Sequence, residues 1–296
     1  MRSAPVLMCL SLGAFFLPSH ATGSIAQPTV VSQDPANFTP NVEDDAVVDH
    51  TAVFALGQLG GKIYAGGTFH KVQNAARTQT YTRNNMMAFN ATTGDVDPSF
   101  LPTFNAPVWA IEPSGTSLYV GGDFTTVNGA VHRGLVKIDA ATGEVDSTFK
   151  PAITSGSVTE IRLVNGRLII GGSFPKRLAA LNPTTGADTG YINLAITGKV
   201  ASNTGATTVY RFAVNPAGTR LVALGNFTSV GGQSRKRAFM LTLGATAASL
   251  NAWYYQPLEN MCRASSIPQY MRDVDFSPDG SYFVFASTGY IPLTGG

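Results

Sequence analysis

The chain has 296 residues, of which 44% are hydrophobic and 13% are charged. This length allows one large domain or two ordinary ones, and it is enough for a hydrophobic core without disulfide or metal support. The 20 Lys and Arg residues nearly balance the 18 Asp and Glu residues, and the net charge of +2 argues against an electrostatic nucleic-acid binder. Few charges together with 31 Gly and 17 Phe are typical of an all-β globular protein.

The first 21 residues have the three-part pattern of a secretory signal peptide. Arg2 provides a positive start, residues 5–17 are uncharged and apolar, and Ser19 and Ala21 place small side chains at the two positions that a signal peptidase reads. The apolar stretch is short for a membrane span, and the alternative is a buried N-terminal strand or helix. We therefore expect cleavage after Ala21, export of the protein, and no transmembrane segment in the rest of the chain.

Cysteine usage agrees with export. Cys9 lies within the apolar stretch and leaves with it, so that Cys262 has no partner in the mature chain. An odd thiol in an oxidising compartment predicts a disulfide partner outside this chain, in another polypeptide or in sequence not present here. The alternative is a buried free cysteine.

Residues 22–45 are predicted to form a linker or an N-terminal strand, and a repeat begins after them. The repeat is marked by small residues followed by a phenylalanine, and it returns every 50 to 55 residues at Phe69, Phe124, Phe174 and Phe227. Each copy begins with a strand that starts with valine, at residues 53–56, 108–111, 158–161 and 209–212. A fifth copy starts at Val274. Agreement at several positions of the repeat identifies it as structural.

The second strand of each copy is almost continuously apolar, at residues 62–65, 118–120, 168–170 and 221–224. A sheet with one solvated face would alternate polar and apolar residues, so both faces of these strands are expected to be covered. The glycines that follow suit a position where two backbones approach too closely for a Cβ atom. The phenylalanine would then fill the wedge between neighbouring sheets.

A third strand follows, and in the first three copies it ends in a turn with glycine at Gly94, Gly143 and Gly186. Units of this length, made of short strands and turns, predict a β-propeller. Residues 46–296 would hold four full blades and part of a fifth. Because an incomplete array leaves an apolar blade face in water, we expect the chain to be the front part of a longer protein. The alternative is a five-blade ring closed by residues 22–45.

These motifs resemble the delta-60 repeat family of secreted bacterial β-propellers, and most of all its exported actinobacterial members. The resemblance covers residues 46–288 and includes residues 91–97, 126–129 and 272–280. It implies a propeller fold, further blades and a second cysteine downstream of the position of Cys262. The third copy departs from the pattern by its short loop at residues 173–177, and the fourth lacks the Thr-Gly turn. The resemblance implies no particular biochemical activity.

No catalytic, cofactor or metal motif is recognised in the sequence. The histidines remaining after export, His50, His70 and His132, fall at different positions of the repeat and are expected in solvated loops. Paired acids could serve glycoside cleavage or calcium binding. Their place beside turns favours a structural role instead, for Asp95, Asp97, Glu144, Asp146 and Asp188 and for Asp273, Asp275 and Asp279.

Two further groups stand out. Residues 235–237 (Arg-Lys-Arg) are expected to form a small solvated basic loop. Trp253, Tyr254 and Tyr255 could form a sugar-binding platform, but core packing is the commoner use of such residues.

The sequence therefore predicts an exported, non-catalytic binding or scaffold module for an extracellular glycan or protein, without nucleic-acid partners. One alternative is a polysaccharide-active enzyme with carboxylates at the propeller channel. Another is a structural spacer that displays downstream domains, because propellers host all three roles.

Overall fold

The computed structural model describes residues 37–288 except 47, 49, 201–204 and 260–269. The expected signal peptide with Ala21, residues 22–36 and Cys262 lie outside the described residues. The described residues form antiparallel strands and one short 3-10 helix, Gln256–Glu259. In that part of the chain, no helix is long and apolar enough to cross a membrane.

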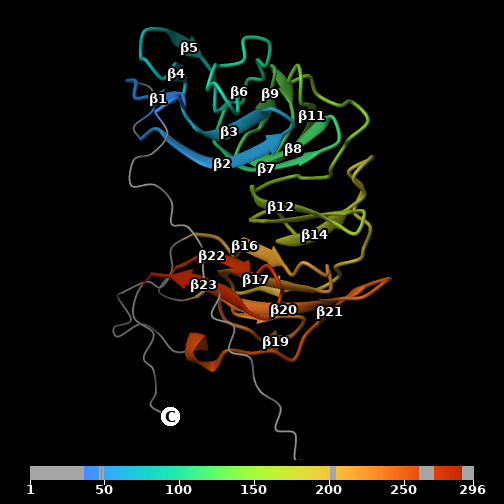
Figure 1. Ribbon diagram of the computed structural model, residues 1–296. Helices are drawn as coiled ribbons and strands as arrows, with labels where there is room; N and C mark the ends of the chain where they lie inside the picture. The colour runs from blue at the N-terminus through green and yellow to red at the C-terminus, as the bar shows by residue number, and fades with distance from the viewer. Residues whose placement is uncertain (1–36, 47, 49, 201–204, 260–269, 289–296) are drawn as a thin grey trace, which may run out of the picture. The chain divides into compact units, whose positions relative to one another are not determined.

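One antiparallel sheet forms from each repeat, and the second strand of the repeat lies at its centre (Figure 1). The first strands are β2 (Ala52–Leu59), β7 (Val108–Ser114), β12 (Val158–Val164), β16 (Thr208–Val214) and β22 (Met271–Phe276). The second strands are β3 (Lys62–Thr68), β8 (Ser117–Gly122), β13 (Arg167–Gly172), β17 (Arg220–Asn226) and β23 (Phe283–Ser287). The third strands are β6 (Met86–Asn90), β11 (Leu135–Asp139), β14 (Leu178–Leu181) and β20 (Ala238–Leu243).

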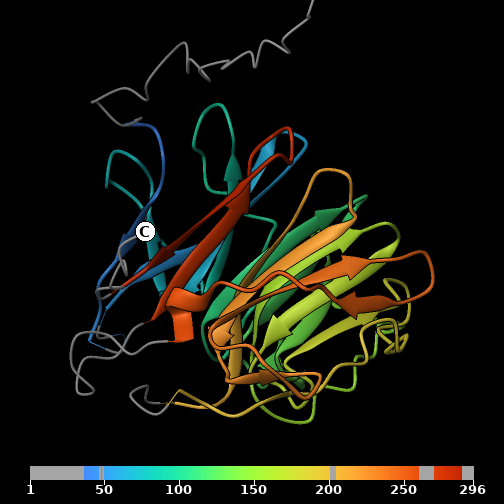
Figure 2. The same cartoon turned by 90° about the horizontal axis from the view of Figure 1, so that it is seen from below.

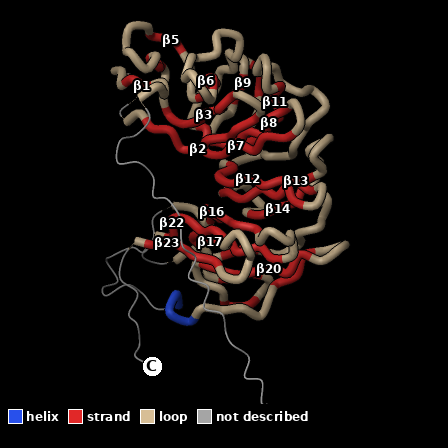
Figure 3. Tube along the Cα trace, in the orientation of Figure 1, coloured by secondary structure: helices blue, strands red, loops and turns tan. Residues whose placement is uncertain are grey.

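Neighbouring sheets pack face to face in sequence order, which makes them blades of a β-propeller. The first strands contact one another in the series β2, β7, β12, β16 and β22. Figure 2 shows the sheets alongside one another, and Figure 3 shows that loops connect their strands. The predicted propeller is confirmed, and the two-stranded sheet β22–β23 is consistent with a fifth, partial blade.

The loop after the phenylalanine forms a small lateral hairpin in three of the four repeats. These hairpins are β4 (Lys71–Gln73) with β5 (Thr80–Thr82), β9 (Thr126–Val127) with β10 (Ala130–Val131), and β18 (Ser229–Val230) with β19 (Gln233–Ser234). The shortened loop of the third repeat is a tight turn. A further strand, β15 (Ile196–Thr197), pairs with β18.

Part of the segment predicted to be a linker or strand is β1 (Asn41–Glu43), which pairs with β4 of the first repeat. These residues therefore extend the first blade's lateral hairpin. The alternative of a ring closed by residues 22–45 stays a prediction, because residues 22–36 lie outside the described residues.

The third strand ends differently in the fourth blade. In the first three, the turn glycines Gly94, Gly143 and Gly186 have φ of 75°, 81° and 77°, a conformation that disfavours other residues. The fourth repeat lacks this turn and instead continues into a fourth strand, β21 (Ala248–Leu250), which pairs with β20.

The first glycine of each pair forms a hole that the next blade fills. A Cβ atom on Gly66 would lie 2.4 Å from Val108 Cγ1, and one on Gly121 would lie 2.9 Å from Val158 Cγ1. Gly171 faces Val209 in the same way, at 3.1 Å. The predicted close approach is therefore confirmed, and these glycines let the first strand of the next blade pack against the sheet.

The second glycine packs against its own blade. A Cβ atom on Gly67 would lie 1.9 Å from the Ala52 carbonyl oxygen, and one on Gly172 would lie 2.0 Å from that of Ser157. Each first strand has a bulge near this point. The crowding explains why the four complete blades have glycine there, at Gly67, Gly122, Gly172 and Gly225.

A residue with a left-handed backbone conformation precedes the third strand, and its main chain forms hydrogen bonds with both the second glycine and the repeat phenylalanine. In the first blade, Asn85 N–H donates to the Phe69 carbonyl, and Gly67 N–H donates to the Asn85 carbonyl. The same pair of hydrogen bonds occurs in every complete blade. The left-handed residues are Asn85, Gly134, Arg177 and Arg237, with φ between 65° and 67°.

Three of the four repeat phenylalanines fill the wedges between blades, as predicted. Phe124 lies among buried residues of the first and second blades, Phe174 among those of the second and third, and Phe227 among those of the third and fourth. Phe69 packs with Val72 and Val42 of the lateral hairpin region. Burial of each phenylalanine stabilises the fold by about 2 kcal/mol.

We expect Gly66→Ala to lower the free energy of unfolding by about 2 kcal/mol, because the new Cβ overlaps Val108 Cγ1. The cost should shrink in a Val108→Ala background, where the clashing methyl is gone. Gly61→Ala is the matched control, because no heavy atom lies within 4 Å of its Cβ position. Denaturant unfolding of the variants measures the effect, and equal losses for Gly66→Ala and Gly61→Ala would contradict the packing described.

Candidate functional site

Two neighbouring positions of each first strand face a shared interior, and they directly follow the aligned residues Val53, Val108, Val158, Val209 and Met271. The earlier position holds Phe54, Trp109, Thr159, Tyr210 and Arg272, and the later position holds Ala55, Ala110, Glu160, Arg211 and Asp273. All ten line one or both of two cavities, of about 520 Å³ and about 220 Å³. The first blades thus contribute apolar residues and the later blades contribute polar and charged ones.

A buried carboxylate is at the centre of the polar part. Glu160 on β12 is 6% exposed, and its two oxygens bind the guanidinium groups of Arg162 and Arg211, the latter at 3.2 Å. Arg211 also donates to the Thr159 carbonyl oxygen. A buried carboxylate needs such partners, since an unpaired buried charge is costly. Glu160 therefore holds the two arginines in place.

Two further side chains connect adjacent first strands. The hydroxyl of Thr159 is 3.1 Å from the Val209 carbonyl oxygen and 3.0 Å from that of Tyr210, both on β16. Glu112 on β7 accepts a hydrogen bond of 2.8 Å from the backbone N–H of Leu163 on β12. Polar side chains thus fix the spacing of the strands that line the interior.

Burial changes the ionisation of these groups. It raises the pKa of Glu160, although Arg162 and Arg211 oppose the shift, and it raises the pKa of Glu112. Burial also raises the pKa of Tyr210, with a smaller effect of the same sign from Tyr270. The phenol of Tyr210 therefore remains a neutral hydrogen-bonding group at neutral pH.

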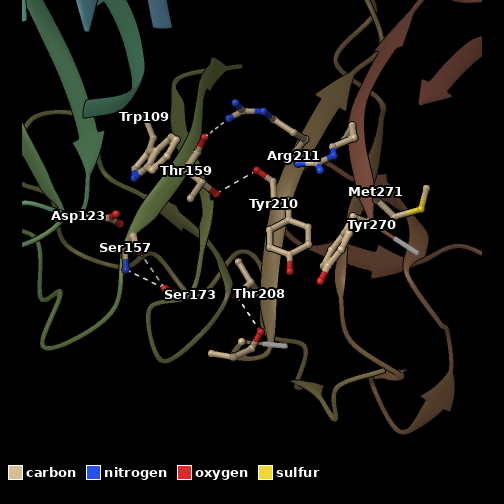
Figure 4. A pocket seen from close by; sticks show the side chains of 13 residues that line it. Trp109, Asp123, Ser157, Thr159, Ser173, Thr208, Tyr210, Arg211, Tyr270 and Met271 are labelled. Atoms are coloured by element: carbon tan, nitrogen blue, oxygen red, sulfur yellow. Dashed lines mark hydrogen bonds between the residues drawn. The ribbon is translucent and has the colours of Figure 1, made fainter. Parts of the chain in front are cut away.

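The larger cavity combines aromatic rings with polar groups (Figure 4). Figure 4 shows Trp109 toward one side and the rings of Tyr210 and Tyr270 near each other toward the other, with Thr159 between. Trp109 also stacks on Phe54, with ring centroids 4.2 Å apart. The other groups that line the larger cavity include Asp123, Ser157 and Ser173, and the last two are joined by a hydrogen bond. Such a mixture suits a ligand with apolar faces and hydroxyl groups.

The acidic residues after the third strands have the structural role that the sequence predicts. Asp97, Asp146 and Asp188 each accept a hydrogen bond from the backbone N–H two residues later. Each also pairs with a lysine of its own repeat. They lie in turns and not in the cavities.

The acids of the fifth repeat are also structural in part. Asp279 accepts hydrogen bonds from Ser277 and Ser281, which hold its pKa at about 2. Asp275 accepts from the following backbone N–H. Asp273, by contrast, lines the smaller cavity with Glu160.

Two of the three histidines, His50 and His70, line one cavity of about 470 Å³ near the first blade. Nδ1 of His70 lies 3.7 Å from Asp45, whereas His132 follows the lateral hairpin of the second repeat. Among the described residues, no group of three or more His, Cys, Asp or Glu side chains could hold a metal ion.

The interpretation of residues 235–237 as a solvated basic loop is wrong for Arg237. This residue is 1% exposed and donates from Nη1 to the Leu258 carbonyl oxygen. Its backbone occupies the left-handed position that joins Phe227 to the third strand. Lys236 pairs with Glu259 at 2.7 Å, and Arg235 lies over the ring of Tyr254.

Core packing accounts for two of the three aromatic residues after the fourth repeat. Trp253 and Tyr255 make edge contacts with Phe283 and Phe285 and belong to the core between the fourth and fifth blades. Tyr254 is 39% exposed and lies outside the two cavities.

The sequence interpretation missed Glu160, Arg211 and Tyr210 because it used these strands only to align the repeats. A signal was available: the position held by Ala55, Ala110, Glu160, Arg211 and Asp273 is alanine in two repeats and charged in three. A charge at a position that is apolar elsewhere in a repeat indicates a special local role.

Comparisons with known proteins agree with the fold. Residues 117–149 match a family described as a domain of unknown function (DUF5122) beta-propeller. No curated protein matches the chain.

Similar solved structures include the C-terminal WD40 domain of Sif2, which is 12% identical with a TM-score of 0.49 and covers 80% of this chain and 67% of its own. The Cps50 (Swd1) beta-propeller domain of Myceliophteria thermophila is 12% identical with a TM-score of 0.39 and covers 80% and 79%. The computationally designed Ika4 protein is 11% identical with a TM-score of 0.40 and covers 69% and 96%. These likenesses are too distant to indicate a function.

We expect Glu160→Gln to lower the free energy of unfolding by about 2 kcal/mol, because two arginines lose their charged partner. Glu144→Gln, on an exposed turn, is the matched control and should change stability little. Thermal and denaturant unfolding provide the measurement, and a Glu160→Gln variant as stable as the control would contradict the role assigned to this carboxylate.

The acidic residues in the turns after the third strands predict that the folded state loses stability at low pH. Hydrogen bonds from Thr148, and the ion pair with Lys137, lower the pKa of Asp146 from 3.8 to about 2. A carboxylate with a lowered pKa stabilises the folded state above its ordinary pKa, and this contribution is lost as the pH falls to the folded value. Asp146→Asn should therefore lose less stability than the wild type as the pH falls from 3.8 to about 2.

Thr148→Ala tests whether the hydrogen bond from Thr148 lowers the pKa of Asp146. It keeps the Asp146 carboxylate and removes its strongest hydrogen-bond donor. Its acid sensitivity, measured as the unfolding free energy across the same pH range, should lie between those of the wild type and Asp146→Asn. Identical acid profiles for all three proteins would show that this turn does not contribute.

Proposed function

We propose that the protein is an exported, non-catalytic binding module that takes an extracellular ligand in the cavity lined by Trp109, Tyr210 and Tyr270, and that this ligand is a glycan. The observation that carries the proposal is the composition of this cavity. Its volume of about 520 Å³ is within the range of small-ligand sites. Export rests on the signal-peptide pattern of residues 1–21.

A sugar matches the groups that line the cavity. The C–H face of a pyranose ring packs on aromatic side chains, which Trp109 and Tyr210 provide. Its hydroxyl groups need donors and acceptors in fixed positions, which Ser157, Ser173 and Asp123 provide. An entirely apolar ligand would leave those polar groups unpaired, which is unfavourable.

The arrangement favours binding over glycoside cleavage. Cleavage requires a pair of carboxyl groups beside one bond, one as acid and the other as nucleophile or base. In the larger cavity, Asp123 is the acidic residue among the lining groups. In the smaller one, Glu160 accompanies Asp273 but is held on both oxygens by arginines. This supports a binding role for the interior.

Isothermal titration of the purified protein with oligosaccharides from cell-envelope and matrix polysaccharides tests the proposal. Tyr210→Ala and Trp109→Ala should each weaken binding about tenfold or more, since each removes an aromatic face of the cavity. Tyr254→Ala, which removes an exposed ring outside the cavities, should bind as the wild type does.

Absence of glycan binding by the wild type, or equal binding by all three variants, would overturn the proposed site. Release of new reducing ends from a polysaccharide, abolished by Asp273→Asn, would instead establish the enzymatic alternative. Binding of a protein from the envelope with no effect of glycans would support the scaffold alternative.

A further inference from the structure

The fifth blade places a charge at a bulge residue of the first strand that is uncharged in the other four blades. There the equivalent residues are Phe54, Trp109, Thr159 and Tyr210. In the fifth blade the residue is Arg272, which lines the larger cavity together with Trp109 and Tyr210. A cation at a position that aromatic rings occupy in three blades indicates a role other than packing.

The guanidinium of Arg272 has no acidic partner in the part of the chain that the structure describes. Residues 201–204 and 260–269, which border the lining of the cavity along the sequence, contain neither Asp nor Glu. Arg211, the other arginine of this cavity, is bound to Glu160 at 3.2 Å and is already neutralised. The positive charge of Arg272 is therefore available to a ligand.

Aromatic rings surround this charge. The guanidinium carbon of Arg272 lies 5.6 Å from the centroid of the Tyr270 ring. Burial raises the pKa of the Tyr210 phenol, Tyr270 adds to that shift, and the charge of Arg272 opposes it, so Arg272 is within electrostatic reach of Tyr210. Figure 4 shows the rings of Tyr210 and Tyr270 near each other. The cation thus lies beside the aromatic faces against which a sugar ring would pack.

The opposite side of the cavity carries a negative charge. Figure 4 shows Asp123 on the side of Trp109, away from Tyr270 and from Met271, the residue that precedes Arg272. A carboxylate there repels an anion and accepts hydrogen bonds from hydroxyl groups. The two charges would therefore orient a ligand, with its anionic group toward Arg272 and its neutral part toward Asp123.

We propose that the glycan bound in this cavity is acidic, and that Arg272 pairs with its anionic group while the sugar ring that carries this group packs against Tyr210 and Tyr270. The inference rests on the proposed function of the same cavity and adds the charge of the ligand. A guanidinium presents parallel N–H donors to two oxygens of one anion, which a carboxylate or a sulfate provides. A neutral glycan offers no such partner.

Titration of the full chain with carboxylated oligosaccharides and their methyl esters tests this proposal, because the ester keeps the sugar chain and removes its charge. Oligomers of galacturonate, glucuronate and mannuronate cover three stereochemistries, and a sulfated galactan represents the other anion. Arg272→Gln removes the guanidinium, whereas Arg272→Lys keeps a charge without the paired donors. Arg220→Gln is the matched control, since exposed Arg220 begins β17 and lines neither cavity.

At least one free acid should bind the wild type and Arg220→Gln at least tenfold more tightly than its methyl ester does. Arg272→Gln should reduce this difference to less than about twofold without changing the affinity for the ester, and Arg272→Lys should restore part of it. Circular dichroism checks that the Arg272 variants are folded, which we expect because the side chain is exposed. Tighter binding of the sulfated chain, lost in Arg272→Gln, would support the anion site and identify sulfate as its ligand.

Equal binding of acids and esters by the wild type would overturn the acidic ligand and leave the proposed function standing. A preference for the acids that persists in Arg272→Gln would overturn the role of Arg272. Binding of no chain in either form would contradict the proposed function as well.

Discussion

The packing of a valine from one sheet into a glycine-sized hole in the preceding sheet is the contact on which this propeller depends. In the first three blades, the second strand has no room for a Cβ atom at Gly66, Gly121 or Gly171 once the next blade is in place. Because the contact joins consecutive repeats, it sets the order and spacing of the sheets. The phenylalanine three residues after the hole then fills the wider part of the wedge between blades.

The contacts between blades determine at which positions of the repeat the side chain is free to differ. In the second, third and fourth blades, Val108, Val158 and Val209 and the residues three positions after them pack against the preceding blade, which leaves the two residues between them to face the interior. In the first two blades the equivalent residues are Phe54 with Ala55 and Trp109 with Ala110, so that part of the interior is apolar. Glu160, Arg211 and Asp273 make the remaining part charged. The division produces the mixed cavity from which the proposed ligand chemistry is inferred.

Much of the fold could be predicted from the sequence because every copy of the repeat is subject to the same steric constraints. The glycine pairs, the phenylalanines and the turn glycines each occupy positions where few residue types fit, so they recur visibly. The left-handed residue before the third strand is equally regular in the backbone, yet it is Asn85, Gly134, Arg177 or Arg237. Its role lies in its main-chain hydrogen bonds, so its identity is free to vary and the pattern is invisible in the sequence. Arg237 was misinterpreted as solvated for this reason.

The candidate site was harder to predict, because it differs from blade to blade. Glu160 binds Arg211 from the next repeat, and a pairing across fifty residues of chain becomes evident only when the blades are placed side by side. Tyr210 and Tyr270 likewise come from different blades. The positions that are alike in all repeats thus indicate the scaffold, while the side chains that differ between repeats line the interior.

The most direct test of the central claim is nuclear Overhauser spectroscopy on protein labelled at glycine and at valine methyl groups. The account predicts contacts between Gly66 Hα and the methyls of Val108, between Gly121 Hα and those of Val158, and between Gly171 Hα and those of Val209. Detection of all three would establish the repeated packing of blade on blade. Formed strands without these contacts would contradict it.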